Sequence, residues 1–349
     1  MECGSLLIPR IERACSIRDL AAVRALLPRT TASLLASGVS AEGVGQILAE
    51  TNDLLTRRLL DLAQAELGAP PSPFCWLTMG SEGRREQSLY TDQDNGLIFS
   101  DHSPADADTY FARMAEWMVS ALEACGARRC QGDVMATNPT WRGPLAAWRD
   151  RFASWIHEPR PEAILRALIG FDFRGVAGDV SLATDLRAWL INCTPGPRRF
   201  LAHLATAALS RRPPLRLLGG FAVPRRGADA GLLDLKRRVL TPMVDAARVL
   251  ALEHGIASTS TLARLDEAGA AGALSAEDAR DMRAAFVGVQ ALRMQRQLAD
   301  VAAGRPLSNA VAPGCLPPAD QTVLRRHLRA LGRVQSVLRI RYAVELMGA

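Results

Sequence analysis

Hydrophobic residues recur at helical spacing through the first 70 positions of the chain. Ser16 to about Leu35 predicts one helix, and Ser40 can cap the start of a longer one that Gly68 ends. The apolar positions of this longer stretch fall on one helical face: Val44, Ile47, Leu48, Leu55, Leu59 and Leu62. Residues 1–70 therefore predict a helical cap that packs on another part of the protein.

The pattern changes near residue 73, where short apolar runs replace the helical spacing. Runs of this length, bounded by turn residues, are typical of buried strands. The expected elements are a strand at Phe74–Met79, a tight loop at Gly80–Gly83, a strand at Gln93–Ser100, a helix from Pro104 to about Ala124 and a strand at Arg129–Ala136. Residues 71–142 thus predict a small α/β core with a mixed sheet.

Helical spacing returns after Trp141 and continues to the end of the chain. Pro161, Thr241-Pro242 and Ser275 each mark the expected start of a helix, and Phe171 to Val176 predicts a short extended piece. Residues 143–349 therefore predict a C-terminal helical bundle. The whole chain is expected to be α+β and mostly helical, and the bundle could support a homodimer.

The charge of the chain favours phosphate ligands. The formal net charge is +6, and Lys236 is the only lysine, so arginine supplies nearly all the positive charge. A basic surface attracts nucleotides or nucleic acids. Because no dense basic block interleaved with aromatic residues appears, we do not expect a nucleic-acid partner.

The remaining composition excludes several classes of protein. No apolar run approaches the roughly 20 residues that span a bilayer, and Glu2 stands where a signal peptide is basic. We therefore expect a cytoplasmic protein without a membrane partner. The seven cysteines contain no C-x-x-C pair, and the five histidines are far apart, so neither a disulfide framework nor a zinc motif is predicted.

The candidate chemistry lies between Gly80 and Asp94. Asp92 and Asp94 stand two residues apart, so on an extended chain they point to the same side. Two such carboxylates repel each other unless a cation lies between them, and Mg²⁺ prefers oxygen ligands. Gly80 lets the backbone approach a phosphate and Ser81 offers a hydroxyl. Arg84 and Arg85 are expected to open a helix whose start, with Arg84, contacts the same anion.

This segment resembles the signature of the polymerase β-like nucleotidyltransferase superfamily, a Gly-Ser turn followed by Asp-x-Asp. It is similar to the N-terminal domain of bacterial protein-PII uridylyltransferases and more closely to the DUF294 nucleotidyltransferases. The resemblance covers roughly residues 30–345. It continues through three further segments: Gly132–Pro139 with Trp141, Phe171–Arg174 with Gly178-Asp179, and Leu233–Arg238.

The resemblance implies roles for individual residues. Gly80 and Ser81 would bind the nucleotide phosphates, and Asp92 and Asp94 would bind Mg²⁺, or Mn²⁺ in its place. The reaction would move a nucleoside monophosphate from an NTP to a hydroxyl group. Many superfamily members add a third carboxylate, for which Asp133 is the first candidate and Asp172 the second. Lys236 could neutralise a triphosphate, although a solvated basic helix face explains it equally well.

Three hypotheses about function remain open at this stage. The first is transfer of UMP or AMP to a tyrosine, serine or threonine of a partner protein, as the resemblance to the uridylyltransferases implies. The second is transfer to a small molecule, as in antibiotic-modifying enzymes. The third is a nucleotide-binding regulatory module with weak or no catalysis, which the uncertain third carboxylate motivates.

Overall fold

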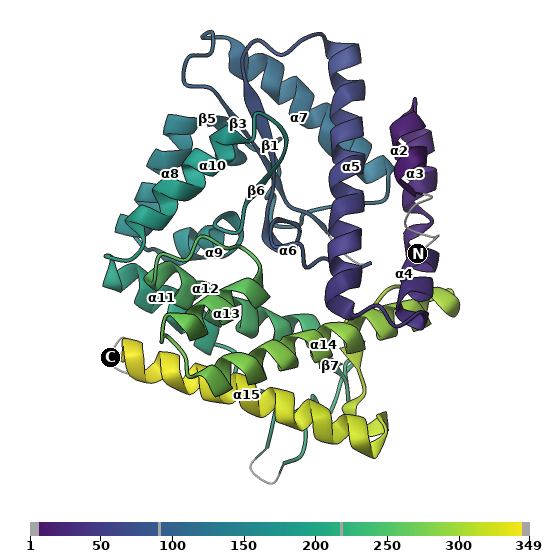
Figure 1. The fold of residues 1–349 in the computed structure, drawn as a ribbon, viewed down its shortest axis with the longest axis vertical. Helices are drawn as coiled ribbons and strands as arrows, with labels where there is room; N and C mark the ends of the chain where they lie inside the picture. The colour runs from purple at the N-terminus through teal and green to yellow at the C-terminus, as the bar shows by residue number, and fades with distance from the viewer. Residues whose placement is uncertain (1–6, 90–91, 217–218, 344–349) are drawn as a thin grey trace. The chain divides into compact units, whose positions relative to one another are not determined.

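The computed structural model describes residues 7–89, 92–216 and 219–343 (Figure 1). The chain forms two compact units. The first consists of Met1–Trp155 with Leu165–Leu190, and the second of Ile156–Ile164 with Ile191–Ala349. Helices predominate in both, and one small mixed sheet lies in the first unit. The predicted α+β, mostly helical class is confirmed.

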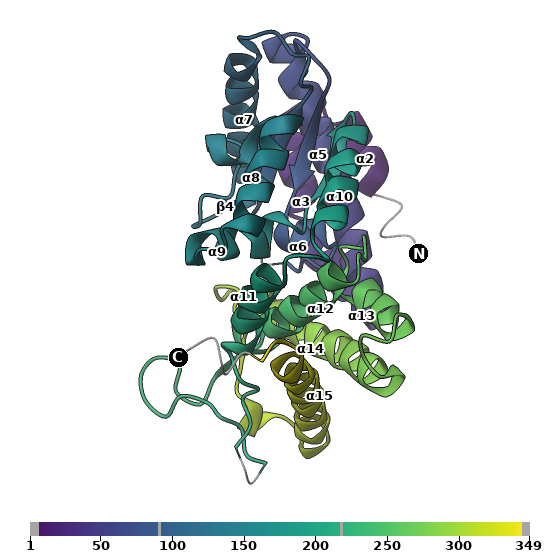
Figure 2. The same cartoon turned by 90° about the vertical axis from the view of Figure 1, so that its left-hand side faces the viewer.

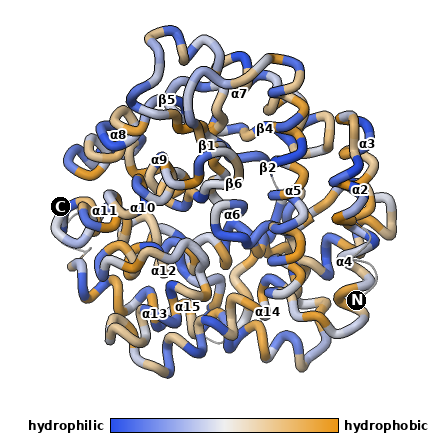
Figure 3. Tube along the Cα trace, turned by 45° about the horizontal axis from the view of Figure 1, so that its top comes forward, coloured by the Kyte–Doolittle hydropathy of each residue, from blue (hydrophilic) through white to orange (hydrophobic). Residues whose placement is uncertain are grey.

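The first unit begins with four consecutive helices of the described chain. These are α2 (Leu7–Arg13), α3 (Ile17–Arg24), α4 (Leu27–Ala36) and α5 (Ala41–Leu67). Ser40 caps α5 by accepting a hydrogen bond of 3.1 Å from the Gly43 amide, and Gly68 follows its last turn with φ +88°. Hydrophobic and hydrophilic positions alternate along α5 (Figure 3), and its buried side packs on α7 (Ala107–Ala124).

A four-stranded sheet forms the centre of the first unit. Its order is β5 (Arg142–Pro144), β3 (Asn95–Phe99), β1 (Phe74–Thr78) and β6 (Arg174–Gly178). Strand β1 runs antiparallel to both neighbours, whereas β3 and β5 are parallel. All five residues of β1 and of β3 are buried, as their continuous apolar runs predict.

Two predicted strands differ from the observed ones. The expected strand at Gln93–Ser100 is divided at Asp94 into β2 (Asp92–Gln93) and β3. The expected strand at Arg129–Ala136 is reduced to β4 (Arg128–Arg129), which pairs in parallel with β2. The chain leaves β4 through a turn in which Asp133 has φ +54°, and this left-handed backbone cannot continue a strand.

Aromatic side chains make up one side of the first unit's core. Trp148 donates a hydrogen bond of 3.2 Å to the Leu97 carbonyl and so attaches α8 (Leu145–His157) to the central sheet. Large rings of this kind bury much apolar area in few residues. The cluster contains Trp141, Trp148, Phe152, Trp155, Phe171 and Phe173. It joins the segment before β6 to the helix after β5.

The second unit is a helical bundle with one short β-pair. Its principal helices, all labelled in Figure 2, are α11 (Arg198–Leu209), α12 (Thr241–Glu253), α13 (Thr261–Ala270), α14 (Ala276–Ala302) and α15 (Pro318–Tyr342). Strand β7 (Leu233–Asp234) pairs with β8 (Ala310–Val311). Ser275 caps α14 as its sequence predicts. No helix in the described ranges is long and apolar enough to cross a membrane.

The close approach of Gly83 to Asp172 provides a test of the first unit's packing. A Cβ atom at Gly83 would lie 1.8 Å from the Asp172 carbonyl oxygen, so Gly83→Ala must displace backbone. We expect the free energy of unfolding to fall by about 3 kcal/mol, at the upper end of overpacking effects. Urea unfolding measures the change.

Gly45→Ala is the matched control. It lies inside α5, and its Cβ would meet only the Arg85 carbonyl at an ordinary 3.6 Å. Alanine is the better helix former, so this variant should be as stable as the native protein or more stable by up to about 1 kcal/mol. Equal losses in the two variants would contradict the packing described for Gly83.

Candidate functional site

The turn after β1 brings Gly80 against Asp94. The Met79 amide donates a hydrogen bond of 2.8 Å to the Asp94 carbonyl, and the chain then forms a single helical turn, α6 (Gly80–Gly83). Gly80 has φ +56°, and a Cβ there would lie 2.7 Å from Asp94 Oδ2. Glycine is required at this position for both reasons. The structure thus joins one predicted phosphate-binding residue to one predicted metal ligand.

The residues between and after the aspartates hold this segment in place. Gln93 and Asn95 are buried, and Asn95 Nδ2 donates a hydrogen bond of 3.1 Å to Gln93 Oε1. Asn95 Oδ1 accepts a second bond from the Ala136 amide at 2.8 Å. Because successive residues of an extended chain point to opposite sides, Asp92 and Asp94 share the other, partly exposed side.

Each of the two aspartates has a side chain that donates a hydrogen bond to it: an arginine at Asp92 and a thiol at Asp94. Arg128 Nη2 lies 3.3 Å from Asp92 Oδ1; the Arg128 side chain is exposed and that of Asp92 is partly exposed. The Cys130 thiol hydrogen-bonds the Asp94 carboxylate, and burial together with that negative charge raises the pKa of Cys130 to about 12. Both partners supply a hydrogen to a carboxylate that would otherwise repel its neighbour.

The candidates for a third carboxylate are engaged elsewhere. Asp133 is exposed in its left-handed turn and accepts a hydrogen bond of 2.8 Å from Asn138 Nδ2. Asp172 is fully buried and lies 2.8 Å from Arg84 NH1. Within the ranges that the structure describes, no three Asp, Glu, His or Cys side chains form a group able to hold a metal ion.

Arg84 and Arg85 differ in what they contact. Arg84 binds Glu86 and Asp172, both at 2.8 Å, and its side chain is only 12% exposed. Arg85 is exposed, has φ +58° and lies 4.0 Å from Asp53. The expectation that these arginines open a helix is wrong, because the turn ends at Gly83 and the left-handed backbone of Arg85 redirects the chain.

The remaining predicted phosphate-binding residues lie in different units. Ser81 is partly exposed within α6, and its carbonyl accepts a hydrogen bond of 2.9 Å from the Glu86 amide. Lys236 belongs to the second unit, where it begins a short π-helix, Lys236–Leu240, immediately before α12. The Lys236 carbonyl accepts a hydrogen bond from the Thr241 hydroxyl at 2.9 Å. The side chain of Lys236 is partly exposed.

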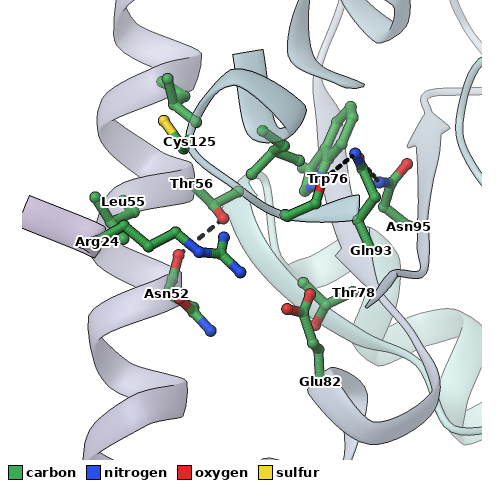
Figure 4. A pocket seen from close by; sticks show the side chains of 13 residues that line it. Arg24, Asn52, Leu55, Thr56, Trp76, Thr78, Glu82, Gln93, Asn95 and Cys125 are labelled. Atoms are coloured by element: carbon green, nitrogen blue, oxygen red, sulfur yellow. Dashed lines mark hydrogen bonds between the residues drawn. The ribbon is translucent and has the colours of Figure 1, made fainter. Parts of the chain in front are cut away.

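A small cavity with both polar and apolar lining lies behind the turn, between α5 and the sheet (Figure 4). Its volume of about 10 Å³ matches one water molecule. Trp76 Nε1, Thr78 Oγ1 and Asn52 Oδ1 line it, and none of these buried atoms has a hydrogen-bond partner among the described residues. The Glu82 carboxyl group also lines it. The turn is therefore supported by a polar layer, which costs free energy unless its groups are satisfied.

Glu82 is a much weaker acid in this cavity than in water. Burial is the main cause that raises its pKa to about 7, and the charges of Asp94 and Asp53 act in the same direction. Arg24 and Arg174 oppose the shift. Glu82 therefore carries less negative charge behind the two aspartates at neutral pH than an ordinary carboxylate would.

The carboxylates of Asp92 and Asp94 fit Mg²⁺ if a nucleotide and water supply its other ligands. Magnesium is commonly held by one or two carboxylates, with substrate phosphates and waters as its other ligands. The two aspartates satisfy that pattern, and Gly80 leaves the space beside Asp94 free of a side chain. We expect such a site to bind the metal together with a nucleotide rather than alone.

Sequence reasoning missed Arg128 and Cys130. Both follow the helix α7 and come within reach of the aspartates only because β4 pairs with β2. The two-residue strands carry no periodic signal, so no pattern in the sequence predicts this pairing.

The raised pKa of Glu82 predicts a specific dependence of stability on pH. Between pH 4.5 and 7 the folded protein keeps a proton on Glu82 that the unfolded chain releases. The free energy of unfolding should therefore fall as pH rises through this window, by up to about 3 kcal/mol. Glu82→Gln should remove this component, which urea unfolding at several pH values measures. Glu50→Gln, an exposed position on α5, should not.

Two family models match the chain and together cover most of it. The model described as "Putative nucleotidyltransferase DUF294" matches residues 25–162, which include the turn and both aspartates. The model described as "Putative nucleotidyltransferase substrate binding domain" matches residues 198–342, which include Lys236. No curated protein matches the chain. With the Gly80 turn and Asp94 in contact inside the first match, the chain belongs to the DUF294 family of nucleotidyltransferases.

Proposed function

We propose that this protein transfers a nucleoside monophosphate from an NTP to a hydroxyl acceptor, with Mg²⁺ held by Asp92 and Asp94. The observation that supports this most directly is the 2.7 Å that would separate a Gly80 Cβ from Asp94 Oδ2. Only a glycine lets this turn lie directly against the Asp94 carboxylate, and this contact brings together the two segments to which we assign phosphate and metal binding.

The proposed reaction is an in-line displacement at the α-phosphorus. The acceptor oxygen forms a bond to phosphorus, the bond to the β-phosphate oxygen breaks, and pyrophosphate leaves. The acceptor's proton passes to solvent. Mg²⁺, or Mn²⁺ in its place, supplies charge neutralisation of the triphosphate when bound. Asp92 and Asp94 hold that charge in position, and the Gly80 turn fixes how closely a phosphate can approach.

The other predicted residues have different roles in this proposal. Ser81 and the exposed guanidinium of Arg85 contact phosphates from the turn. Arg84, held by Glu86 and Asp172, acts by fixing the turn. Asp133 would serve as a third carboxylate only after leaving Asn138, its partner at 2.8 Å. Lys236 belongs to the second unit, and we assign it no contact with the two aspartates.

We propose a protein side-chain hydroxyl as the acceptor, with uridylyl or adenylyl transfer both open. The family model over residues 198–342 is described as a substrate-binding domain, and on that basis we assign acceptor binding to the second unit. A small-molecule acceptor is the alternative outcome of the labelling experiment below.

A nucleotide-binding module without turnover is the second candidate function. It is favoured by one observation, that no group of three metal-binding side chains forms among the described residues. Such a module would bind metal and NTP through Asp92 and Asp94 and release them unchanged.

Label transfer distinguishes these functions. The native protein is mixed with Mg²⁺, host lysate and each α-labelled NTP in turn, and labelled protein and small molecules are separated. We expect one NTP to label an acceptor, and Asp92→Asn and Asp94→Asn to reduce the rate by about 100-fold or more, or at least 2.7 kcal/mol of barrier. Asp61→Asn, an exposed position on α5, is the control.

The outcomes of this experiment separate the hypotheses. Label on a protein band supports the proposed acceptor, and label on a small molecule replaces it. Metal-dependent NTP binding without label supports the non-enzymatic module. Neither binding nor label from any NTP would reject both.

Gly80→Ala tests the contact that carries the proposal. Its methyl group would push against the Asp94 carboxylate, so Mg²⁺-dependent NTP binding should weaken by about tenfold or more. Gly68→Ala is the matched control, because Gly68 has φ +88° but nothing within 4 Å of its Cβ. The control bears similar backbone strain and should bind NTP normally. Calorimetric titration with metal and NTP measures the NTP affinity of both variants.

A further inference from the structure

Arg128 faces the candidate site because of the strand pair that carries it. In the parallel pairing of β2 and β4, Asp92 lies opposite Arg128 and Gln93 opposite Arg129. Arg128 NH2 reaches Asp92 Oδ1 at 3.3 Å. Gln93 points inward and donates to the carbonyls of Val119 and Ala127 at 3.2 and 3.1 Å. Arg128 is thus on the side of the aspartates.

Arg129, its neighbour in sequence, is directed away from the site. Its guanidinium donates to Glu123 at 2.8 Å and to Ser120 at 3.2 Å, and lies 3.6 Å from Glu116, all on α7. The alternation of side chains along a strand separates the two arginines. The chain therefore contains two adjacent arginines of equal charge, one at the site and one held on a helix.

The ion pair between Arg128 and Asp92 is weak enough for Arg128 to exchange Asp92 for another anion. The side chains are 56% and 33% exposed, and exposed ion pairs contribute at most about 1 kcal/mol. A divalent cation on Asp92 removes the charge that attracts Arg128, and a triphosphate places new negative charge nearby. A guanidinium matches phosphate oxygens in two-pronged geometry better than any other side chain.

We propose that Arg128 changes partner when the site fills: it pairs with Asp92 in the empty site and binds a phosphate of the nucleotide once a divalent cation occupies Asp92. This rests on the proposed function, because it takes Asp92 as a metal ligand. It assigns to Arg128 two opposite effects. Arg128 competes with the free cation for Asp92 and strengthens the binding of the cation–triphosphate complex.

Those opposite effects define the experiment. Mn²⁺ binding to the full chain is measured by electron paramagnetic resonance, first alone and then with inorganic triphosphate, which removes any dependence on the base. For Arg128→Ala we expect Mn²⁺ alone to bind about threefold more tightly and Mn²⁺–triphosphate about tenfold more weakly. Arg128→Lys should fall between the native protein and the alanine variant. Arg129→Ala should leave both affinities within about twofold.

Each result decides a different claim. If Arg128→Ala lowers both affinities or changes neither while the native protein binds Mn²⁺–triphosphate, the partner exchange is wrong and the proposed function stands. If the native protein binds Mn²⁺–triphosphate no better than Asp92→Asn does, the metal site and the partner exchange both fail. A structural role for Arg128 would weaken both ligands together, so opposite shifts in the two affinities are the diagnostic result.

Discussion

The candidate site depends on the contact between the turn after β1 and Asp94. The Met79 amide is bonded to the Asp94 carbonyl at 2.8 Å, and this places a left-handed Gly80 against the Asp94 carboxylate. Neither a larger residue nor a different backbone conformation fits there. Since β1 and β3 are neighbours in the buried sheet, the hydrophobic core positions the two chain segments that the chemistry requires.

Ion pairs between partly buried arginines and buried carboxylates hold this turn from the other side. Arg84 joins Glu86 and Asp172, and Arg174 binds both oxygens of Asp53 at 2.7 and 2.8 Å. Removing one partner of a buried pair leaves an uncompensated charge and costs about 3–5 kcal/mol. Arg84 therefore stabilises the turn through these ion pairs. Its position in the sequence instead predicts a direct contact with phosphate.

The negative charge of the two aspartates is partly compensated within the described residues. Arg128 pairs with Asp92, the Cys130 thiol hydrogen-bonds Asp94, and the raised pKa of Glu82, about 7, reduces the negative charge behind the turn. An arrangement of this kind lowers the repulsion that a bare pair of carboxylates would suffer. It also explains why we expect metal and nucleotide to bind together, since the phosphates bring the remaining ligands and the charge that draws Arg128 away.

The sequence by itself determined the elements with long periodic patterns and the identity of the central motif. Local residue choice predicts the apolar stripe of α5, the caps at Ser40 and Ser275 and the buried strand before Gly80. The sequence also contains the motif itself, a Gly-Ser turn followed by Asp-x-Asp. Tertiary structure alone decided the rest. The two-residue strands β2 and β4 exist only through each other, so the contact of Arg128 with Asp92 has no local signal. The positive φ of Asp133 likewise interrupts a predicted strand, and that of Arg85 prevents a predicted helix from starting. Short elements are too small to be stable alone, and long-range packing therefore selects them.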